Sequence, residues 1–150
     1  MIDTPGHSDF SYEVSRSLAA VEGAILLVDA TKGIQAQTIY NLDLARKQNL
    51  FLIPVVNKID LPHAQVEKTK EEIQKLFPVF PENILEISAK KGVNVEKLLE
   101  KVIQEIPAPS GFLEKPLRAL IFDSRFDPYK GVIAYVRIVD GKLKNNEDIY

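Results

Sequence analysis

The chain has 150 residues, 45% of them hydrophobic and 27% charged, and its formal net charge is −2. This composition excludes intrinsic disorder, because the apolar residues suffice for a core. The nearly balanced charge gives no electrostatic reason to expect binding to nucleic acid or to a membrane surface. The absence of cysteine excludes disulfides and thiolate metal sites. No apolar run approaches the length of a transmembrane helix.

The first two thirds of the chain alternate between short apolar runs and amphipathic stretches. The runs are typical of strands buried on both faces, and the stretches are typical of helices. The predicted strands are Ala24–Val28, Leu50–Asn57 and Ile84–Ser88, and the predicted helices are Tyr12–Val21, Gln37–Lys47, Gln65–Phe77 and Val95–Ile106. This alternation predicts an α/β fold, with a parallel sheet that helices cover on both faces.

The pattern changes after the segment Pro107–Gly111, which breaks the last predicted helix and is typical of a linker. Two further strands are predicted at Leu117–Asp123 and Val132–Val139. Asp140-Gly141 predicts a hairpin turn after the second of them. The predicted division is an α/β domain at 1–109, a linker at 110–116 and the beginning of an all-β domain at 117–150.

The sequence Asn57-Lys58-Ile59-Asp60 ends the second predicted strand, where open parallel sheets bind ligands. Its chemistry suits guanine. The Asp60 carboxylate can accept both N–H groups of the base's Watson–Crick edge, and adenine has no such donor pair. Asn57 can bond to the base's acceptors, and the stem of Lys58 can lie across the ring. The alternative interpretation is a polar strand end with a solvated lysine and aspartate.

A second motif, Asp3-Thr4-Pro5-Gly6-His7, lies near the front of the chain. An aspartate at a strand end can hold a metal-bound water, as the second acidic element of phosphate-loop NTPases does. Gly6 lets a backbone N–H approach a terminal phosphate. His7 stands where a side chain could orient an attacking water. The alternative is a plain Pro-Gly turn with a surface histidine, which five fixed residues ahead of N-K-x-D disfavour.

The third motif, Ser88-Ala89-Lys90, ends the third predicted strand. The backbone N–H of Ala89 could contact the carbonyl oxygen of a base, and the stem of Lys90 could cover the second face of its ring. In isolation, three such common residues would indicate an ordinary loop. Their position at the end of the strand that follows N-K-x-D in the chain is what favours a role in binding.

These three motifs, in this order and each at a strand end, resemble the third, fourth and fifth guanine-nucleotide motifs of the translational GTPase superfamily. Within it, the chain is most similar to the LepA family, also called elongation factor 4. The stretches that carry this likeness are D-F-S-Y-E-V-S-R-S-L-A-A from Asp9, I-P-V-V-N-K-I-D-L-P from Ile53 and F-D-S-R-F-D-P-Y-K-G-V from Phe122. A relative of elongation factor G is the alternative, but the interval from Asn57 to Ser88 is too short for that family's insertion.

The resemblance implies a phosphate-loop-NTPase-like sheet without its first strands, followed by the start of a β-barrel domain. It implies a GTPase that uses GTP or GDP with Mg²⁺ and acts on the ribosome, where LepA-like proteins remodel or reverse a translocation state. It implies that Asp3 holds the metal through a water, that Gly6 contacts the γ-phosphate and that His7 orients the attacking water. It also implies that the base is bound by Asn57, Lys58 and Asp60. Supporting contacts to the base would come from Ser88, Ala89 and Lys90. It also implies ribosomal RNA and proteins as partners, no DNA, and a cytoplasmic or organellar translation compartment. Peripheral membrane association is left open.

The chain departs from the family pattern at its front. Nothing in it matches G-x-x-x-x-G-K-[ST], the loop that cradles the phosphates, and the threonine of the first switch region is missing too. Both would lie before Met1. Ser8 stands where valine is common in the family.

Because the phosphate loop is missing, a second hypothesis is a truncated, catalytically inactive fragment that retains the guanine-recognition half. A third, an unrelated α/β module with another ligand, is disfavoured by three ordered motifs.

The family's sheet order implies one further expectation. In these GTPases the strand that leads to the phosphate loop lies between the strand ending at Asp3 and the strand Ala24–Val28. Without it, Ala24–Val28 would be an exposed apolar edge, and such edges recruit other strands. We therefore expect the chain by itself to associate, and neither to bind GTP tightly nor to hydrolyse it.

Overall fold

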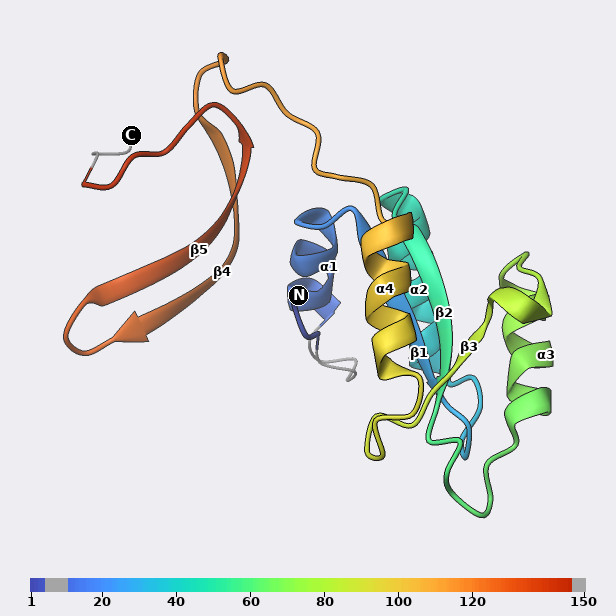
Figure 1. Cartoon of the computed structure of the whole chain (residues 1–150). Helices are drawn as coiled ribbons and strands as arrows, with labels where there is room; N and C mark the ends of the chain where they lie inside the picture. Colours follow the sequence, from blue (N-terminus) through green and yellow to red (C-terminus); the bar gives the residue numbers. More distant parts are fainter. Residues whose placement is uncertain (5–10, 147–150) are drawn as a thin grey trace. The chain divides into compact units, whose positions relative to one another are not determined.

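The computed structural model of the chain describes residues 1–4 and 11–146 (Figure 1). It divides into two compact units: the α/β unit, Glu22–Pro107, and the hairpin unit, Met1–Val21 with Ala108–Tyr150. The elements in chain order are α1 (Ser11–Ala19), β1 (Gly23–Asp29), α2 (Ala36–Lys47), β2 (Phe51–Asn57), α3 (Val66–Leu76), the 3-10 helix η2 (Pro81–Asn83), β3 (Leu85–Glu86), α4 (Val95–Glu105), β4 (Arg118–Asp127) and β5 (Gly131–Asp140). The helices and strands predicted from residue 12 onward are present, with some ends shifted.

The α/β unit contains a parallel sheet in the order β1-β2-β3. β1 and β2 pair along their whole length, so that Asp29 lies opposite Asn57. The short β3 pairs with β2 at Leu85 and Glu86. Because all three strands run in the same direction, their carboxyl ends meet at one edge of the sheet, as the predicted α/β class requires.

Helices cover both faces of this sheet, since successive residues of a strand point to opposite faces. On one face, Leu26, Val28 and Val56 form a cluster with Leu42 of α2 and Ile73 of α3. Figure 1 shows α2 and α4 on opposite sides of the strands. The predicted covering of both faces is confirmed.

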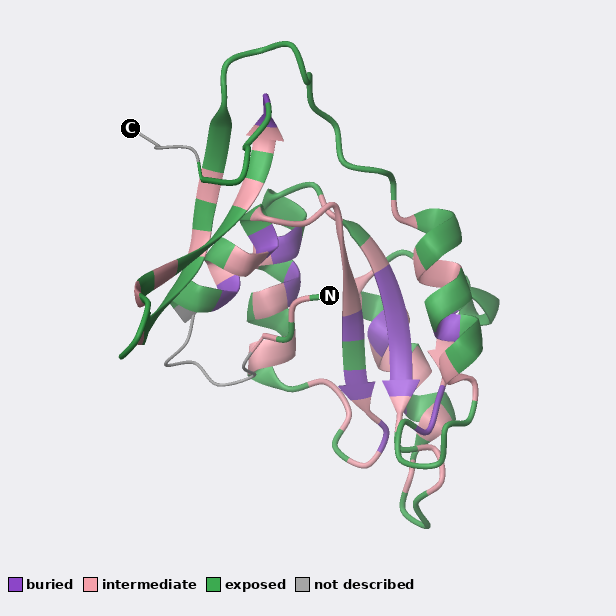
Figure 2. Ribbon diagram, turned by 60° about the vertical axis from the view of Figure 1, so that its left-hand side comes forward, coloured by how far each residue is buried: buried purple, intermediate pink, exposed green. Residues whose placement is uncertain are grey.

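On the other face, Ile53 and Val55 of β2 form a second cluster with Leu98 of α4. The cover is incomplete over β1, where Leu27 is 53% exposed. Figure 2 shows the same contrast, with β2 buried continuously along its second half and β1 carrying an exposed position between buried ones. Among the described residues β1 pairs with β2 alone, so it is an edge strand of the kind that the sequence analysis expects.

The hairpin unit contains the antiparallel pair β4 and β5. Their turn follows Asp127, whose Oδ1 accepts the backbone N–H groups of Tyr129 and Lys130, both at 2.9 Å. Gly131 then begins β5 with φ +77°, a conformation that glycine adopts without strain. This turn joins the two predicted strands, whereas the predicted Asp-Gly turn falls at the end of β5, of which Asp140 is the last residue.

Asp140, the first residue of that predicted turn, has another role in the described structure. It is buried, and its carboxylate accepts the N–H of Phe112 at 3.0 Å and two guanidinium N–H groups of Arg118 at 3.1 and 2.8 Å. Chiefly the Phe112 N–H, and then Arg118, lower the pKa of this carboxyl. Asp140 therefore ties the end of β5 to the segment that leads into β4.

The front of the chain differs from one prediction. Met1–Thr4 form neither helix nor strand, so the expected strand ending at Asp3 is not present. A strand needs a hydrogen-bonded neighbour, and the two described sheets contain none for these residues. The domain limits 1–109, 110–116 and 117–150 stay predictions. Within residues 1–4 and 11–146, no helix has the length and apolarity that crossing a membrane requires.

Candidate nucleotide-binding site

The two motifs N-K-x-D and S-A-K lie together at the carboxyl edge of the sheet. Asn57 is the last residue of β2, and Ser88 follows the end of β3. Backbone hydrogen bonds join these ends, from Ile87 N–H to the Val56 carbonyl oxygen at 2.8 Å and from Ile59 N–H to the Ile87 carbonyl oxygen at 3.4 Å. The sheet thereby holds the two motif loops next to each other.

The Asn57 side chain links the two loops directly. Its Oδ1 accepts the backbone N–H of Lys58 at 2.8 Å and that of Ala89 at 3.1 Å. With the oxygen engaged, the Nδ2 amide is the end of Asn57 that suits a base acceptor. The sequence predicts that the Ala89 N–H contacts a base carbonyl oxygen, but in this structure it donates to Asn57 Oδ1. A base could accept this N–H by sharing it with Asn57 or by replacing Asn57 as its acceptor.

Asp60 is held by the second link between the loops. The Ser88 hydroxyl, which is 0% exposed, donates to Asp60 Oδ1 at 2.7 Å and accepts the Lys91 N–H at 3.2 Å. The Ser88 hydrogen bond is the main reason why the pKa of Asp60 lies below its usual range, and nearby Lys90 and Lys91 lower it further. Asp60 is therefore ionised at neutral pH, in the acceptor-only form that paired N–H donors require.

Lys58 has an unusual backbone conformation, with φ +66°. Residues other than glycine rarely adopt positive φ, and such positions concentrate at functional sites. The Lys58 ammonium lies 2.6 Å from Oδ2 of Asp29, the last residue of β1. Sequence reasoning did not assign Asp29 to the site. The sequence feature that could have pointed to Asp29 is its position as a single carboxylate directly after an apolar run.

Three predicted residues cannot be joined to this edge. Gly6 and His7 lie outside the described residues. Asp3 is described and exposed, but it belongs to the hairpin unit and not to the α/β unit. Residues 1–4 and 11–146 contain no group of three or more metal-ligand side chains. The metal contact of Asp3, the phosphate contact of Gly6 and the catalytic role of His7 stay predictions.

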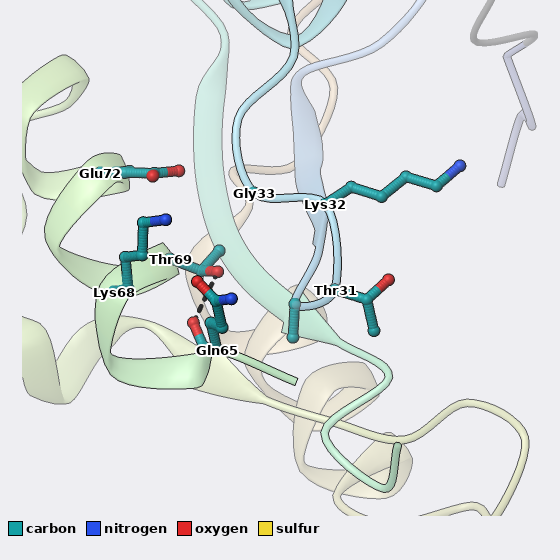
Figure 3. A pocket seen from close by; sticks show the side chains of 8 residues that line it. Thr31, Lys32, Gly33, Gln65, Lys68, Thr69 and Glu72 are labelled. Atoms are coloured by element: carbon teal, nitrogen blue, oxygen red, sulfur yellow. Dashed lines mark hydrogen bonds between the residues drawn. The ribbon is translucent and has the colours of Figure 1, made fainter. Parts of the chain in front are cut away.

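A polar cavity of about 130 Å³ lies near this edge but is lined by other residues (Figure 3). It is enclosed by Ala30, Thr31, Lys32, Gly33, Gln65, Lys68, Thr69 and Glu72. Glu72 Oε2 accepts the Ile34 N–H at 3.0 Å, and the Thr69 hydroxyl donates to the Gln65 carbonyl oxygen at 2.8 Å. The Glu72 bond, together with the Gln65 N–H that donates to the Ala30 carbonyl oxygen at 2.7 Å, fastens the loop after β1 to α3. We therefore interpret the cavity as a structural gap between these two segments.

The chain has an α/β fold with an open parallel sheet, and in such folds ligands bind at the carboxyl ends of the strands. A family model, Elongation factor Tu GTP binding domain, matches residues 1–108, and the chain belongs to this family. The resemblance to translational GTPases is thereby confirmed.

Curated relatives are named Elongation factor 4. The chain is 59% identical to that of Streptomyces avermitilis and 60% identical to that of Pseudarthrobacter chlorophenolicus, in each case over 149 residues, which are 99% of this chain and 24% of the relative. It is 55% identical over 149 residues to that of Dehalococcoides mccartyi strain BAV1, covering 25% of the relative. The chain thus spans about a quarter of the length of these relatives.

Proposed function

We propose that this chain recognises the guanine base of GTP and GDP within a GTPase that acts on the ribosome, as its likeness to Elongation factor 4 suggests. The observation that carries the proposal is the pair of side-chain links between loops: Asn57 with Ala89, and Ser88 with Asp60. They join two motifs that lie about thirty residues apart into one polar surface.

The chemistry of this surface favours guanine over adenine. Asp60 offers a carboxylate that is fixed through one oxygen and ionised, so it can accept the two N–H groups that guanine presents side by side. Asn57 offers an amide donor. The stems of Lys58 and Lys90, both exposed, offer apolar surfaces for the two faces of the ring.

The phosphate end of the site rests on the resemblance. Asp3 would hold Mg²⁺ through water, and a single exposed carboxylate fits an ion that keeps most of its ligands as waters and phosphate oxygens. The ion would neutralise charge on the phosphates. Gly6 would donate its N–H to the γ-phosphate, and His7 would orient the attacking water. Ribosome-stimulated hydrolysis that His7→Ala leaves unchanged would contradict the last role. Peripheral membrane association is not part of this proposal.

The test uses the full gene product, meaning the protein encoded by the complete reading frame that contains this chain. Asp60→Asn replaces an acceptor oxygen with a donor amide and leaves guanine N–H groups unpaired. Each unpaired group costs ~1–3 kcal/mol, so GDP affinity should fall by roughly tenfold or more. Xanthosine diphosphate, which has a carbonyl in place of the exocyclic amine, should tolerate the change better.

Asp43→Asn is the matched control for this titration. Asp43 lies on α2 with its side chain 58% exposed and pairs with Arg46 at 3.9 Å, away from the motif loops in sequence. Its loss should leave GDP affinity unchanged. If Asp60→Asn and Asp43→Asn behaved alike, Asp60 would not read the base.

A further inference from the structure

The ion pair between Asp29 and Lys58 joins a residue of the N-K-x-D motif to Asp29, which lies outside all three motifs. Asp29 ends β1 directly opposite Asn57, which ends β2. The positive φ of Lys58 turns the chain so that its ammonium reaches back to Asp29 at 2.6 Å. The pair therefore connects the N-K-x-D loop to the end of β1, while Asn57 and Asp60 connect the same loop to S-A-K.

Asp29 is itself fixed from the other side. Its Oδ1 accepts the backbone N–H of Thr31 at 2.8 Å and the Thr31 hydroxyl at 2.7 Å, while its Oδ2 faces the Lys58 ammonium. The carboxylate cannot rotate without losing these contacts. Its side chain is 20% exposed, so water screens the pair less than it would a surface pair.

Lys58, the other residue of the pair, is more exposed than Asp29. The Lys58 side chain is 48% exposed although its charged end is held. A lysine loses much rotamer freedom when a ligand fixes it, and this loss weakens binding. Asp29 already fixes Lys58 before a ligand arrives. The exposed stem of Lys58 can therefore contact the ligand without a further loss of rotamer freedom.

We propose that Asp29 is a positioning residue for guanine nucleotide binding, which it supports by holding Lys58 extended beside the base site. This inference rests on the proposed function, because it assumes that the stem of Lys58 contacts the base. Asp29 itself contacts Lys58 and Thr31 and need not touch the nucleotide.

The test is a double-mutant cycle for GDP binding to the full gene product. Asp29→Asn keeps an acceptor for Thr31 and removes the charge that holds Lys58. It should weaken GDP binding by about 3- to 10-fold. Lys58→Met removes the held group, and adding Asp29→Asn to it should produce no further loss. Additive losses would overturn the proposal, because a merely structural Asp29 would act whether or not Lys58 were present.

A matched control breaks a similar ion pair elsewhere in the α/β unit. Glu86→Gln removes the closer of the two carboxylate partners of Lys70, whose ammonium lies 2.7 Å from Glu86 Oε1 and 3.8 Å from Glu67 Oε1. It should leave GDP affinity unchanged. Asp29→Glu is a second variant in case Asp29→Asn does not fold: it keeps the charge but shifts the carboxylate by one methylene, and should produce an intermediate loss.

The outcomes separate the two proposals. If the unsubstituted protein does not bind GDP, or Asp60→Asn does not weaken it, the proposed function fails and this inference fails with it. If Asp60→Asn weakens GDP binding while Asp29→Asn leaves it unchanged or strengthens it, only the role of Asp29 is refuted. Strengthening would mean that the ion pair competes with the nucleotide for Lys58.

Discussion

The sheet of the α/β unit and the β4–β5 hairpin are both built from strands rich in apolar residues, yet they bury these residues very differently. Val55 and Val56, on opposite faces of β2, are each 0% exposed. Phe126 and Val132 lie opposite each other in the hairpin, and each is 75% exposed. An apolar sequence thus predicts a strand but does not decide how fully other elements cover it. In the hairpin unit α1 contacts β4 but leaves these positions open, and a hairpin without a full covering layer is at best marginally stable in water.

The two regions also differ in how their polar side chains are used. At the carboxyl edge of the sheet, Asn57 and Ser88 join loops that are distant in the chain. In the hairpin turn, Asp127 bonds to residues two and three positions ahead. The Asp127 link closes a turn, and the long-range bonds of the buried Asp140 tie the end of β5 to an earlier segment. The links at the sheet edge differ from both, because they leave a polar surface that a ligand can use.

The largest expected difference between the regions is in stability. Ile73→Ala should destabilise the α/β unit by about 2–5 kcal/mol, because Ile73 is fully buried between α3 and the sheet. Val132→Ala, at an exposed hairpin position, should change stability by about 0.5 kcal/mol or less. Urea unfolding of both variants measures this, and similar losses would show that the hairpin is covered in solution.

The second expected effect concerns association of the chain by itself. β1 is an edge strand with Leu27 exposed, and exposed apolar edges pair with other strands. The chain should therefore elute as an associated species in size-exclusion chromatography with light scattering. Leu27→Lys should shift it toward monomer, because a charge on the edge strand opposes pairing. If Val132→Lys had this effect and Leu27→Lys did not, the hairpin would be the region that associates.

The smallest expected effect is a dependence of stability on pH. Burial raises the pKa of Asp29, but hydrogen bonds from Lys58 and Thr31 outweigh it and lower this pKa to about 2. A lowered carboxyl pKa stabilises the fold above the unfolded value of about 3.9, and this stabilisation is lost as the pH falls toward 2.

Asp29→Asn should thus cost about 1 kcal/mol at pH 7, after allowance for solvent screening, and almost nothing near pH 2. Urea unfolding at both pH values compares the variant with the unsubstituted chain. The exposed hairpin substitution Val132→Ala should show no such dependence on pH, since it removes no ionisable group. A cost of Asp29→Asn that stayed constant down to pH 2 would contradict the ion pair.

The amino-acid sequence by itself predicted the helices and strands from residue 12 onward and the two motifs that meet at the edge of the sheet. Periodicity is a local property: the apolar runs at Ala24–Val28 and Leu50–Asn57 contain enough information to predict strands. The sequence also predicted that N-K-x-D and S-A-K would end neighbouring strands. It did not predict the turn after Asp127 or the second use of Asp140, since both depend on partners elsewhere in the hairpin unit.

Only the tertiary structure decided how the site residues are connected. Asn57 meets Ala89, Asp60 meets Ser88 and Lys58 meets Asp29 because parallel strands bring their carboxyl ends to one edge of the sheet. These partners lie far apart along the chain, and no sequence pattern states which atoms will pair. Asp29 shows this most clearly: as a residue after an apolar run it had no assigned role, and the register of β1 against β2 placed it within reach of Lys58.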